Sequence, residues 1–265
     1  MLVAVAAGPV LAGCAGGGTA QDPATAGLAA VFPPQVRARA QGSFGLDRWE
    51  PVTDAPPAAA GRGLRVRFPQ GSVSPSATRD YGAPAGGMQA YLPRVDGPLD
   101  AAYLRYWVRF PADFAFARGG KLPGLWGGTQ VSGGDEPDGD DGFSTRLMWR
   151  SGGDGEVYLY APSRSGDSLG RGDWTWPTDR WVCVEQQVVL NEPGSENGSV
   201  TVWLDGNQVH RTADLDYRSV ADLKIEGIFF STFFGGNERS WASPRDQYAD
   251  FAGFSLTPDR VGCAA

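Results

Sequence analysis

Short stretches in which apolar and polar residues alternate run through most of the chain, and they constrain its fold more than any other feature. A period of two puts successive side chains on opposite faces of a β-strand, and no stretch shows a long helical period. Clusters of Gly, Pro, Asn and Asp separate the stretches, as in all-β sandwiches and barrels. We therefore expect two antiparallel sheets packed face to face, with at most a short helix near 34–41. The alternating stretches lie at residues 63–68, 103–110, 142–150, 155–160 and 181–190.

The clearest hairpin is Val200–Arg211, in which Asp205-Gly206 forms the turn, because this dipeptide favours two-residue β-hairpin loops. The sequence after residue 27 shows neither a repeat of fixed period nor a second linker. All-β sandwiches of about this length commonly form one domain. The sequence therefore predicts a single domain over residues 28–265.

The first 27 residues differ from the rest and are predicted to be a signal and a flexible linker. Residues 11–14 read LAGC, which resembles the lipobox of bacterial lipoproteins, where cleavage precedes the cysteine and a lipid is attached to it. The positive charge expected at the start of a signal peptide is missing, so a plain apolar leader is the alternative. We expect export to the bacterial cell envelope or secretion, with membrane contact only through a lipid on Cys14.

Two further cysteines, Cys183 and Cys263, follow Cys14. An even pair in an exported chain favours one disulfide, which here would tie the C-terminal tail to a strand. Two free buried thiols are the alternative.

The charge pattern narrows the range of partners. The chain has a formal net charge of −7, with 21 arginines and only two lysines, Lys121 and Lys224. A negative net charge argues against general affinity for nucleic acids. It leaves an acidic polysaccharide open as a partner, because a local basic groove can bind a polyanion.

Most familiar catalytic motifs are absent. The single histidine, His210, has no nucleophile elbow to serve, and the sequence has no His/Cys metal cluster and no phosphate-binding loop. The acidic stretch 133–142 could offer carboxylates to calcium, but it lacks the EF-hand spacing, and a solvated loop is the simpler interpretation. We expect neither a metal nor a cofactor.

Two neighbouring stretches concentrate polar groups on one surface. In each, every second residue shares a face, and the SGGDG between them is typical of a turn, so the two strands should pair. Pairing would place Arg146 beside Tyr158. The residues on the shared face are Ser144, Arg146, Met148 and Arg150 of the first stretch and Glu156, Tyr158 and Tyr160 of the second.

Lys121 lies within GGKLPGLWGG, in a chain whose basic residues are almost all arginine. Lysine, arginine and tyrosine together suit β-elimination from a uronate, which removes a proton next to a carboxylate. A cation neutralises the carboxylate, while a base and an acid handle the C5 proton and the departing O4 oxygen. Lysine and tyrosine can fill these roles where a nearby cation lowers the pKa of the base.

Other polar and aromatic residues on predicted strands are candidates for contact with a ligand, although a solvated strand face explains each one singly. The predicted substrate-binding residues are Arg105, Trp107, Trp126, Arg150, Gln187, Ser231 and Phe233.

Several motifs together resemble polysaccharide lyase family 14, in the same order and at similar spacing over about Leu64 to Phe254. The motifs are FPADFAFARGGKLPGLWGG, GFSTRLMWR, GEVYLY and FFSTFFGG, with LRVRFPQGSVSP and VVLNEPGSENGSVTVWLDG as flanking strands. The resemblance implies a β-jelly-roll sandwich whose concave sheet forms the substrate cleft. It also implies an alginate or glucuronan lyase without a cofactor. The stretch before Leu64 does not match clearly.

The family's functional residues are a lysine in a glycine-rich loop, a Ser-x-Arg and a Tyr-x-Tyr, which correspond here to Lys121, Ser144 and Arg146, and Tyr158 and Tyr160. We expect one tyrosine, Tyr158, to be the main proton carrier, with Lys121 assisting. The glycines around Lys121 would let the backbone pass close to a sugar chain. We expect a monomer that acts on an acidic polysaccharide.

Two alternatives stay open at this stage. One is a carbohydrate-binding sandwich without catalysis. The other is a sandwich glycoside hydrolase that uses Glu156 and Glu185.

Overall fold

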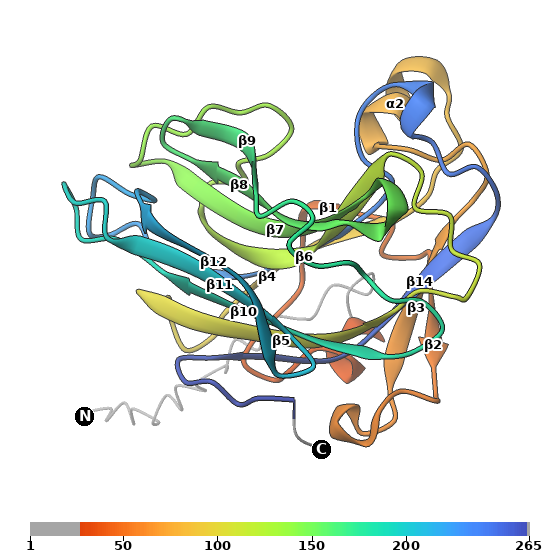
Figure 1. Ribbon diagram of the computed structural model, residues 1–265, viewed down its shortest axis with the longest axis horizontal. Helices are drawn as coiled ribbons and strands as arrows, with labels where there is room; N and C mark the ends of the chain where they lie inside the picture. The colour runs from red at the N-terminus through yellow and green to blue at the C-terminus, as the bar shows by residue number, and fades with distance from the viewer. Residues whose placement is uncertain (1–26, 264–265) are drawn as a thin grey trace, which may run out of the picture.

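Residues 27–263 are described by the computed structural model, and they form two antiparallel seven-stranded sheets packed face to face (Figure 1). This is the predicted all-β jelly-roll sandwich. The cleft sheet has the order β1 (Arg39–Phe44), β4 (Met88–Pro93), β13 (Gly227–Thr232), β6 (Gly119–Gly128), β7 (Gly142–Arg150), β8 (Gly155–Ala161) and β9 (Arg164–Leu169). The outer sheet has the order β12 (Asn207–Leu215), β11 (Gly198–Leu204), β10 (Val182–Val189), β5 (Ala101–Arg109), β14 (Gln247–Thr257), β3 (Gly63–Phe68) and β2 (Trp49–Val52).

All five alternating stretches form strands, and the predicted hairpin is β11 and β12 with Asp205 and Gly206 at its turn. The short helix expected near 34–41 is wrong. Residues 34–35 form a turn, Val36 bridges to Arg94, and β1 begins at Arg39.

The one α-helix of the described residues, α2 (Pro75–Tyr81), was missed, although its ends carry ordinary signals. Ser74 caps it by accepting a hydrogen bond from the Ala77 amide at 3.3 Å, and Gly82 ends it in the left-handed region, with φ of 71°. Four 3-10 turns complete the elements: η1 (Gly27–Ala30), η2 (Pro57–Ala59), η3 (Ser151–Gly153) and η4 (Arg239–Trp241).

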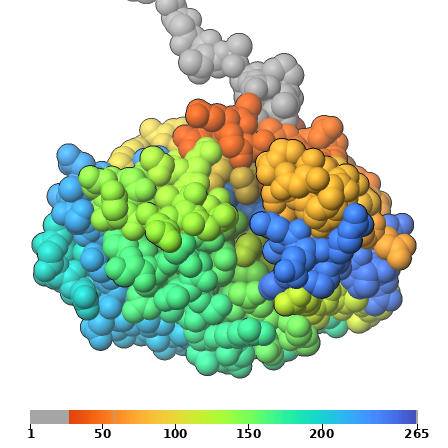
Figure 2. Space-filling view, turned by 90° about the horizontal axis from the view of Figure 1, so that it is seen from above, coloured from red at the N-terminus to blue at the C-terminus, as the bar shows by residue number. Residues whose placement is uncertain are grey.

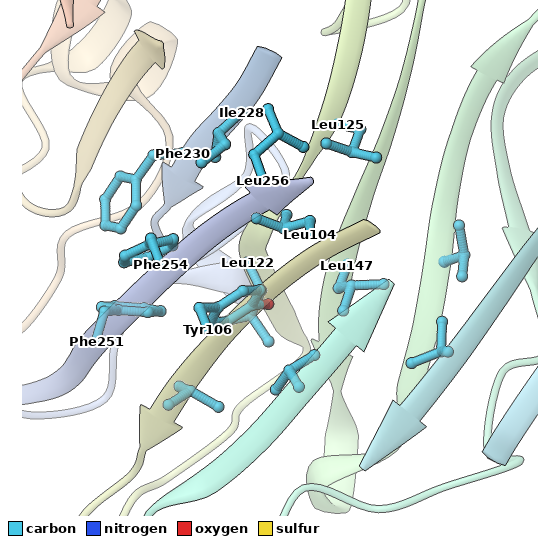
Figure 3. Close-up of a cluster of buried hydrophobic side chains, with 14 of the residues drawn as sticks. Leu104, Tyr106, Leu122, Leu125, Leu147, Ile228, Phe230, Phe251, Phe254 and Leu256 are labelled. Atoms are coloured by element: carbon cyan, nitrogen blue, oxygen red, sulfur yellow. The ribbon is translucent and has the colours of Figure 1, made fainter. Parts of the chain in front are cut away.

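The core lies between the sheets and is built from the inward-facing residues of both (Figure 3). Leu104 and Tyr106 of β5 meet Leu122 and Leu125 of β6, and each is fully buried. Because the apolar residues of each strand occupy this side, the polar residues between them face outward. On β7 and β8 the outward face is the floor of the cleft.

Two buried polar contacts cross the core and hold the centre of the cleft sheet. Gln186 of β10 donates to the Thr145 carbonyl of β7 at 2.6 Å, and Tyr106 donates to the Pro123 carbonyl of β6 at 3.2 Å. Pro123 sits where the register of β6 against β7 shifts, between Leu122 and Gly124. A proline lacks the N–H of a regular ladder, so carbonyls near it need other donors. These contacts supply two.

The expected disulfide joins Cys183 of β10 to Cys263, and the segment after β14 therefore crosses the outer sheet. Arg260 in this segment lies 2.6 Å from Glu185. In Figure 1 the dark-blue segment runs on the side of β5 that faces away from the cleft sheet. No helix among residues 27–263 is long and apolar enough to cross a membrane. The expected lipidation site, Cys14, and the predicted leader lie outside the described residues.

Candidate active site

A cleft of about 500 Å³ crosses the strands of the cleft sheet on its outward side. Its rims come from loops at opposite ends of the strands: residues 132–134 on one side, and residues 74–76 with 236–237 on the other. Figure 2 shows a hollow between the lime-green and the orange segments on this face. The floor and inner walls are formed by Phe44, Gln89, Lys121, Arg146, Tyr158, Tyr160, Ser165 and Phe233.

The pairing of β7 with β8 places the polar residues as expected. Arg146 lies opposite Tyr158, and Ser144 lies opposite Tyr160. Val157 and Leu159, the alternate residues of β8, are fully buried in the core, so the tyrosines must face the cleft. Strand periodicity therefore brings an arginine and two tyrosines to one surface.

Lys121 reaches this surface from β6, and it is only 7% exposed. Its Nζ donates a hydrogen bond to the Met148 sulfur at 2.9 Å and lies 3.4 Å from the centre of the Tyr158 ring. No carboxylate among the described residues forms an ion pair with it. Burial holds the pKa of Lys121 well below its ordinary value, and repulsion by Arg146 and Arg150 lowers it further. The geometry thus favours a neutral amine.

Lys121 sits in a strand rather than a loop, and the glycines near it do not face a sugar chain as expected. A β-carbon at Gly120 would lie 2.0 Å from the ring of Trp149. The glycine therefore makes room for a core side chain beneath the strand.

Arg146 is a buried cation, 2% exposed, at the centre of the cleft. Its Nη1 donates to the Ser231 hydroxyl at 3.4 Å, and its guanidinium carbon lies 4.6 Å from the centre of the Phe229 ring. Its Nε has no hydrogen-bond partner among the described residues, and no carboxylate there forms an ion pair with it. Burial lowers the pKa of Arg146 from its ordinary value. A buried cation without a counter-charge is costly, so this group suits an anionic ligand.

The hydroxyls of Tyr158 and Tyr160 lie 3.3 Å apart, within hydrogen-bonding distance. Tyr160 also accepts a hydrogen bond from the Gly134 amide at 3.0 Å, which ties it to the rim loop. Burial, together with the Tyr160 hydroxyl, raises the pKa of Tyr158 well above its ordinary value. Tyr158 therefore stays protonated at neutral pH and can donate.

Gly166 keeps the space over the two hydroxyls free. It lies on β9 beside an irregularity in the pairing with β8, and its φ is +72°. A β-carbon there would lie 2.7 Å from the Tyr158 oxygen and 3.2 Å from the Tyr160 oxygen.

The match to a family sequence model, named Polysaccharide lyase 14, covers residues 56–254 of this chain. The chain belongs to polysaccharide lyase family 14. The match includes all the strands that carry Lys121, Arg146, Tyr158 and Tyr160.

Solved structures of lyases share the fold. The marine family 14 alginate lyase from Aplysia kurodai is 32% identical, with a TM-score of 0.69, over 82% of this chain and 89% of that chain. The alginate lyase vAL-1 from Chlorella virus is 22% identical, with a TM-score of 0.66, over 84% and 92%. The endo-β-1,4-glucuronan lyase from Trichoderma reesei is 12% identical, with a TM-score of 0.52, over 83% and 89%. No curated protein matches the chain.

Three residues expected to bind substrate in this family 14 chain lie on the wrong side of the molecule. Arg105 and Trp107 are on β5, and Gln187 is on β10, so all three belong to the outer sheet and face away from the cleft. Arg105 instead donates to the Gly262 carbonyl at 3.3 Å. Alternation identified the outward face of each strand correctly, but it cannot tell which sheet the strand joins.

Two further residues expected to bind substrate are engaged by other side chains of the protein. Trp126 is on the cleft sheet, but it is 1% exposed and stacks under the guanidinium of Arg39, whose carbon lies 4.6 Å from its ring centre. Arg150 is not part of the cleft wall. Its Nη2 lies 2.6 Å from a Glu156 oxygen, and Trp241 of η4 covers it with the ring centre 5.6 Å away.

Ser144, expected among the catalytic residues, is buried and satisfied within the protein. Its hydroxyl donates to the Val131 carbonyl at 3.0 Å, so it anchors the base of the rim loop. Phe233 lines the cleft as expected. Ser231 lies beneath the floor of the cleft. Its hydroxyl accepts a hydrogen bond from Arg146 at 3.4 Å and donates one to the side-chain oxygen of Gln89 at 3.1 Å.

Sequence reasoning missed several cleft residues. Gln89 and Phe44 belong to β4 and β1, which carry no polar alternation that singles them out. Ser74, Ser76 and Asn237 form a hydrogen-bonded group on the opposite rim, assembled from segments more than 160 residues apart. Only the fold brings such residues together.

The hydrolase alternative finds no support in the geometry. Glu156 is on the cleft sheet and Glu185 is on the outer sheet, each buried beside its own arginine. Two carboxylates on different sheets cannot flank one glycosidic bond. In residues 27–263, no group of three or more His, Cys, Asp or Glu side chains is placed to hold a metal ion, the acidic loop included.

Proposed function

We propose that this family 14 protein is a polyuronate lyase that cleaves alginate or glucuronan by β-elimination. The single observation that carries the proposal is Arg146. A guanidinium that is 2% exposed, has no carboxylate partner within residues 27–263 and lines an open cleft beside two tyrosine hydroxyls is suited to a uronate carboxylate.

The pKa shifts divide the proton-transfer roles. Lys121, with its lowered pKa, is available as a neutral amine and suits the base. Tyr158, with its raised pKa, keeps its proton and suits the acid. This assignment departs from the expectation that Tyr158 is the main proton carrier and Lys121 only assists.

The reaction then balances as follows. Arg146 holds the carboxylate and stabilises the negative charge that builds on it as the C5–H bond breaks. The amine of Lys121 takes the C5 proton, and the electron pair of that bond forms the C4–C5 double bond. The C4–O4 bond breaks, and O4 takes the proton of the Tyr158 hydroxyl. The hydroxyl of Tyr160, 3.3 Å away, can stabilise the tyrosinate that remains.

The relatives support a polyuronate as substrate. The 32% identical protein from Aplysia kurodai is an alginate lyase. Another neighbour of the same fold, the alginate lyase Aly36B, has been solved with an alginate trisaccharide. The Trichoderma reesei neighbour is a glucuronan lyase, so glucuronan is a candidate substrate beside alginate.

The deciding experiment incubates the purified protein with polymannuronate, polyguluronate and glucuronan and follows ultraviolet absorbance of the unsaturated product. We expect a signal with at least one polymer, a large loss in Arg146→Ala, and no change in the exposed control Arg62→Ala. New reducing ends without ultraviolet absorbance would show hydrolysis and overturn the proposal. Binding without any cleavage would favour the carbohydrate-binding alternative.

A further inference from the structure

The segment before the family-matched residues contributes to the cleft. The match begins at residue 56, whereas β1 spans Arg39–Phe44 and pairs with β4 as an edge strand of the cleft sheet. Phe44, the last residue of β1, lines the cleft. In Figure 2 the red-orange segment that includes β1 borders one end of the hollow.

Phe44 forms an aromatic surface with Phe233 at this end. Their ring centres are 5.9 Å apart, and the Phe44 side chain is only partly buried. Apolar rings that face a cleft can pack against the C–H faces of a sugar. The guanidinium of Arg48 lies 6.0 Å from the Phe44 ring.

Arg48 is free to take an anionic ligand. Its side chain is 35% exposed, and its one ion pair among the described residues is a 3.8 Å contact with its neighbour Asp47, itself 89% exposed. Exposed ion pairs of this kind contribute little to stability, so a uronate carboxylate can replace Asp47.

A continuous line of hydrogen bonds joins this end of the cleft to its centre. The Gln89 amide donates to the Gly42 carbonyl of β1 at 2.8 Å. Ser231 donates to the other end of Gln89 at 3.1 Å and contacts Arg146 at 3.4 Å. Since β1 and β7 are four strand spacings apart in the sheet, their backbones are separated by roughly 19 Å, and the side chains of Gln89, Ser231 and Arg146 reach across this span. The end of the cleft at β1 is therefore separate from the centre at Arg146.

We propose that β1 and the turn after it, residues 39–48, form an additional subsite that binds a uronate unit remote from the reacting one. Phe44 packs against the sugar ring, and Arg48 pairs with its carboxylate. The subsite rests on the proposed lyase function, and it predicts that affinity depends on the length of the substrate.

The test compares kcat/KM on a series of oligouronates of increasing length from the preferred polymer. In Phe44→Leu and in Arg48→Ala, the loss should grow with length and reach about fivefold or more on the longest oligomers, mainly through KM. Phe44→Tyr keeps the ring and should restore most of the loss. Arg62→Ala removes an exposed arginine from a loop beside the outer sheet and should match wild type at every length.

Thermal unfolding of each variant shows whether the fold is kept, and Phe44→Leu retains the apolar contact with Phe233 for this purpose. A loss of equal size at all lengths, or no loss on long oligomers, would overturn the subsite while the lyase function stands. If the wild type cleaves no polyuronate, the proposed function fails and the subsite fails with it.

Discussion

The amine of Lys121 lies 3.4 Å from the centre of the Tyr158 ring, so that the base and the acid of the proposed reaction are in contact. The π face of the ring is a weak acceptor for an N–H, so it can interact with the amine where no carboxylate among the described residues does. Ionising either group therefore costs free energy. A protonated Lys121 would face Arg146 and Arg150, and an ionised Tyr158 would lose solvation. Both shifts therefore favour the neutral forms that the proposed β-elimination needs.

Activity should rise with pH through the lowered pKa of Lys121, because only the neutral amine can accept the C5 proton. It should fall again only above the ordinary tyrosine value of about 10, because the pKa of Tyr158 is raised. Lys121→Arg keeps a charge but removes the base, so kcat should fall by roughly 100-fold or more, as in Lys121→Ala. A pH profile of kcat/KM checks this. Substantial activity in Lys121→Arg with the acid limb in place would assign the limb to another group.

The two tyrosines should respond differently to loss of the hydroxyl. Tyr158→Phe removes the proposed proton donor, so kcat should fall by roughly 100-fold with little change in KM. Tyr160→Phe removes the hydroxyl that accepts a hydrogen bond from the Gly134 amide, so the rim loop loosens. In this variant KM should rise in addition to any fall in kcat. Steady-state kinetics on one oligouronate separate the two patterns. Equal effects on kcat and KM in both variants would show that they act as one unit.

Much of the site could be predicted from sequence because β-strands have a strict period. The alternation in 142–150 and 155–160, with a turn between, is enough to place Arg146 beside Tyr158. Lys121 stands out as one of only two lysines, and the family motifs supported it, but no local pattern reveals its place on the neighbouring strand β6.

The mispredicted site residues depend on the order of strands and on loop contacts, which the sequence of a single strand does not determine. Arg105 and Gln187 face outward as expected, but the order of strands in the two sheets puts them on the far side of the sandwich. Ser144 is on the expected face of β7, but a loop covers it. Its hydroxyl is hydrogen-bonded to the carbonyl of Val131, 13 residues earlier in the chain, a contact that only the folded loop creates. Phe44 was missed because β1 pairs with β4 across 45 residues of sequence.

Loss of the disulfide between Cys183 and Cys263 should destabilise the fold and leave the chemistry intact. The bond spans 80 residues of sequence and pins the segment that carries Arg260 against the outer sheet. In the chain-entropy account, a loop of this length contributes about 4 kcal/mol. The double variant Cys183→Ser, Cys263→Ser should have a clearly lower melting temperature. The kcat of the folded protein should stay near the wild-type value, because the disulfide is on the sheet opposite the cleft. A matching drop in kcat at low temperature would instead couple the outer sheet to catalysis.

Gly166→Ala tests whether the open space over the tyrosine hydroxyls is needed for activity. The added methyl group would lie 2.7 Å from the Tyr158 oxygen, closer than van der Waals contact allows, and alanine is disfavoured at a φ of +72°. The Tyr158 ring must therefore turn away, which moves its proton from the leaving oxygen, so kcat should fall by at least tenfold. Gly172→Ala is the matched control, since its φ is +84° and the nearest atom to its β-carbon, an Asp154 oxygen, is 3.8 Å away. Gly172→Ala has a similar backbone strain without the clash. Its melting temperature should fall by about as much as that of Gly166→Ala, while its kcat stays at the wild-type value. If the two variants lose activity equally, backbone strain explains the loss and the space over Tyr158 is not required.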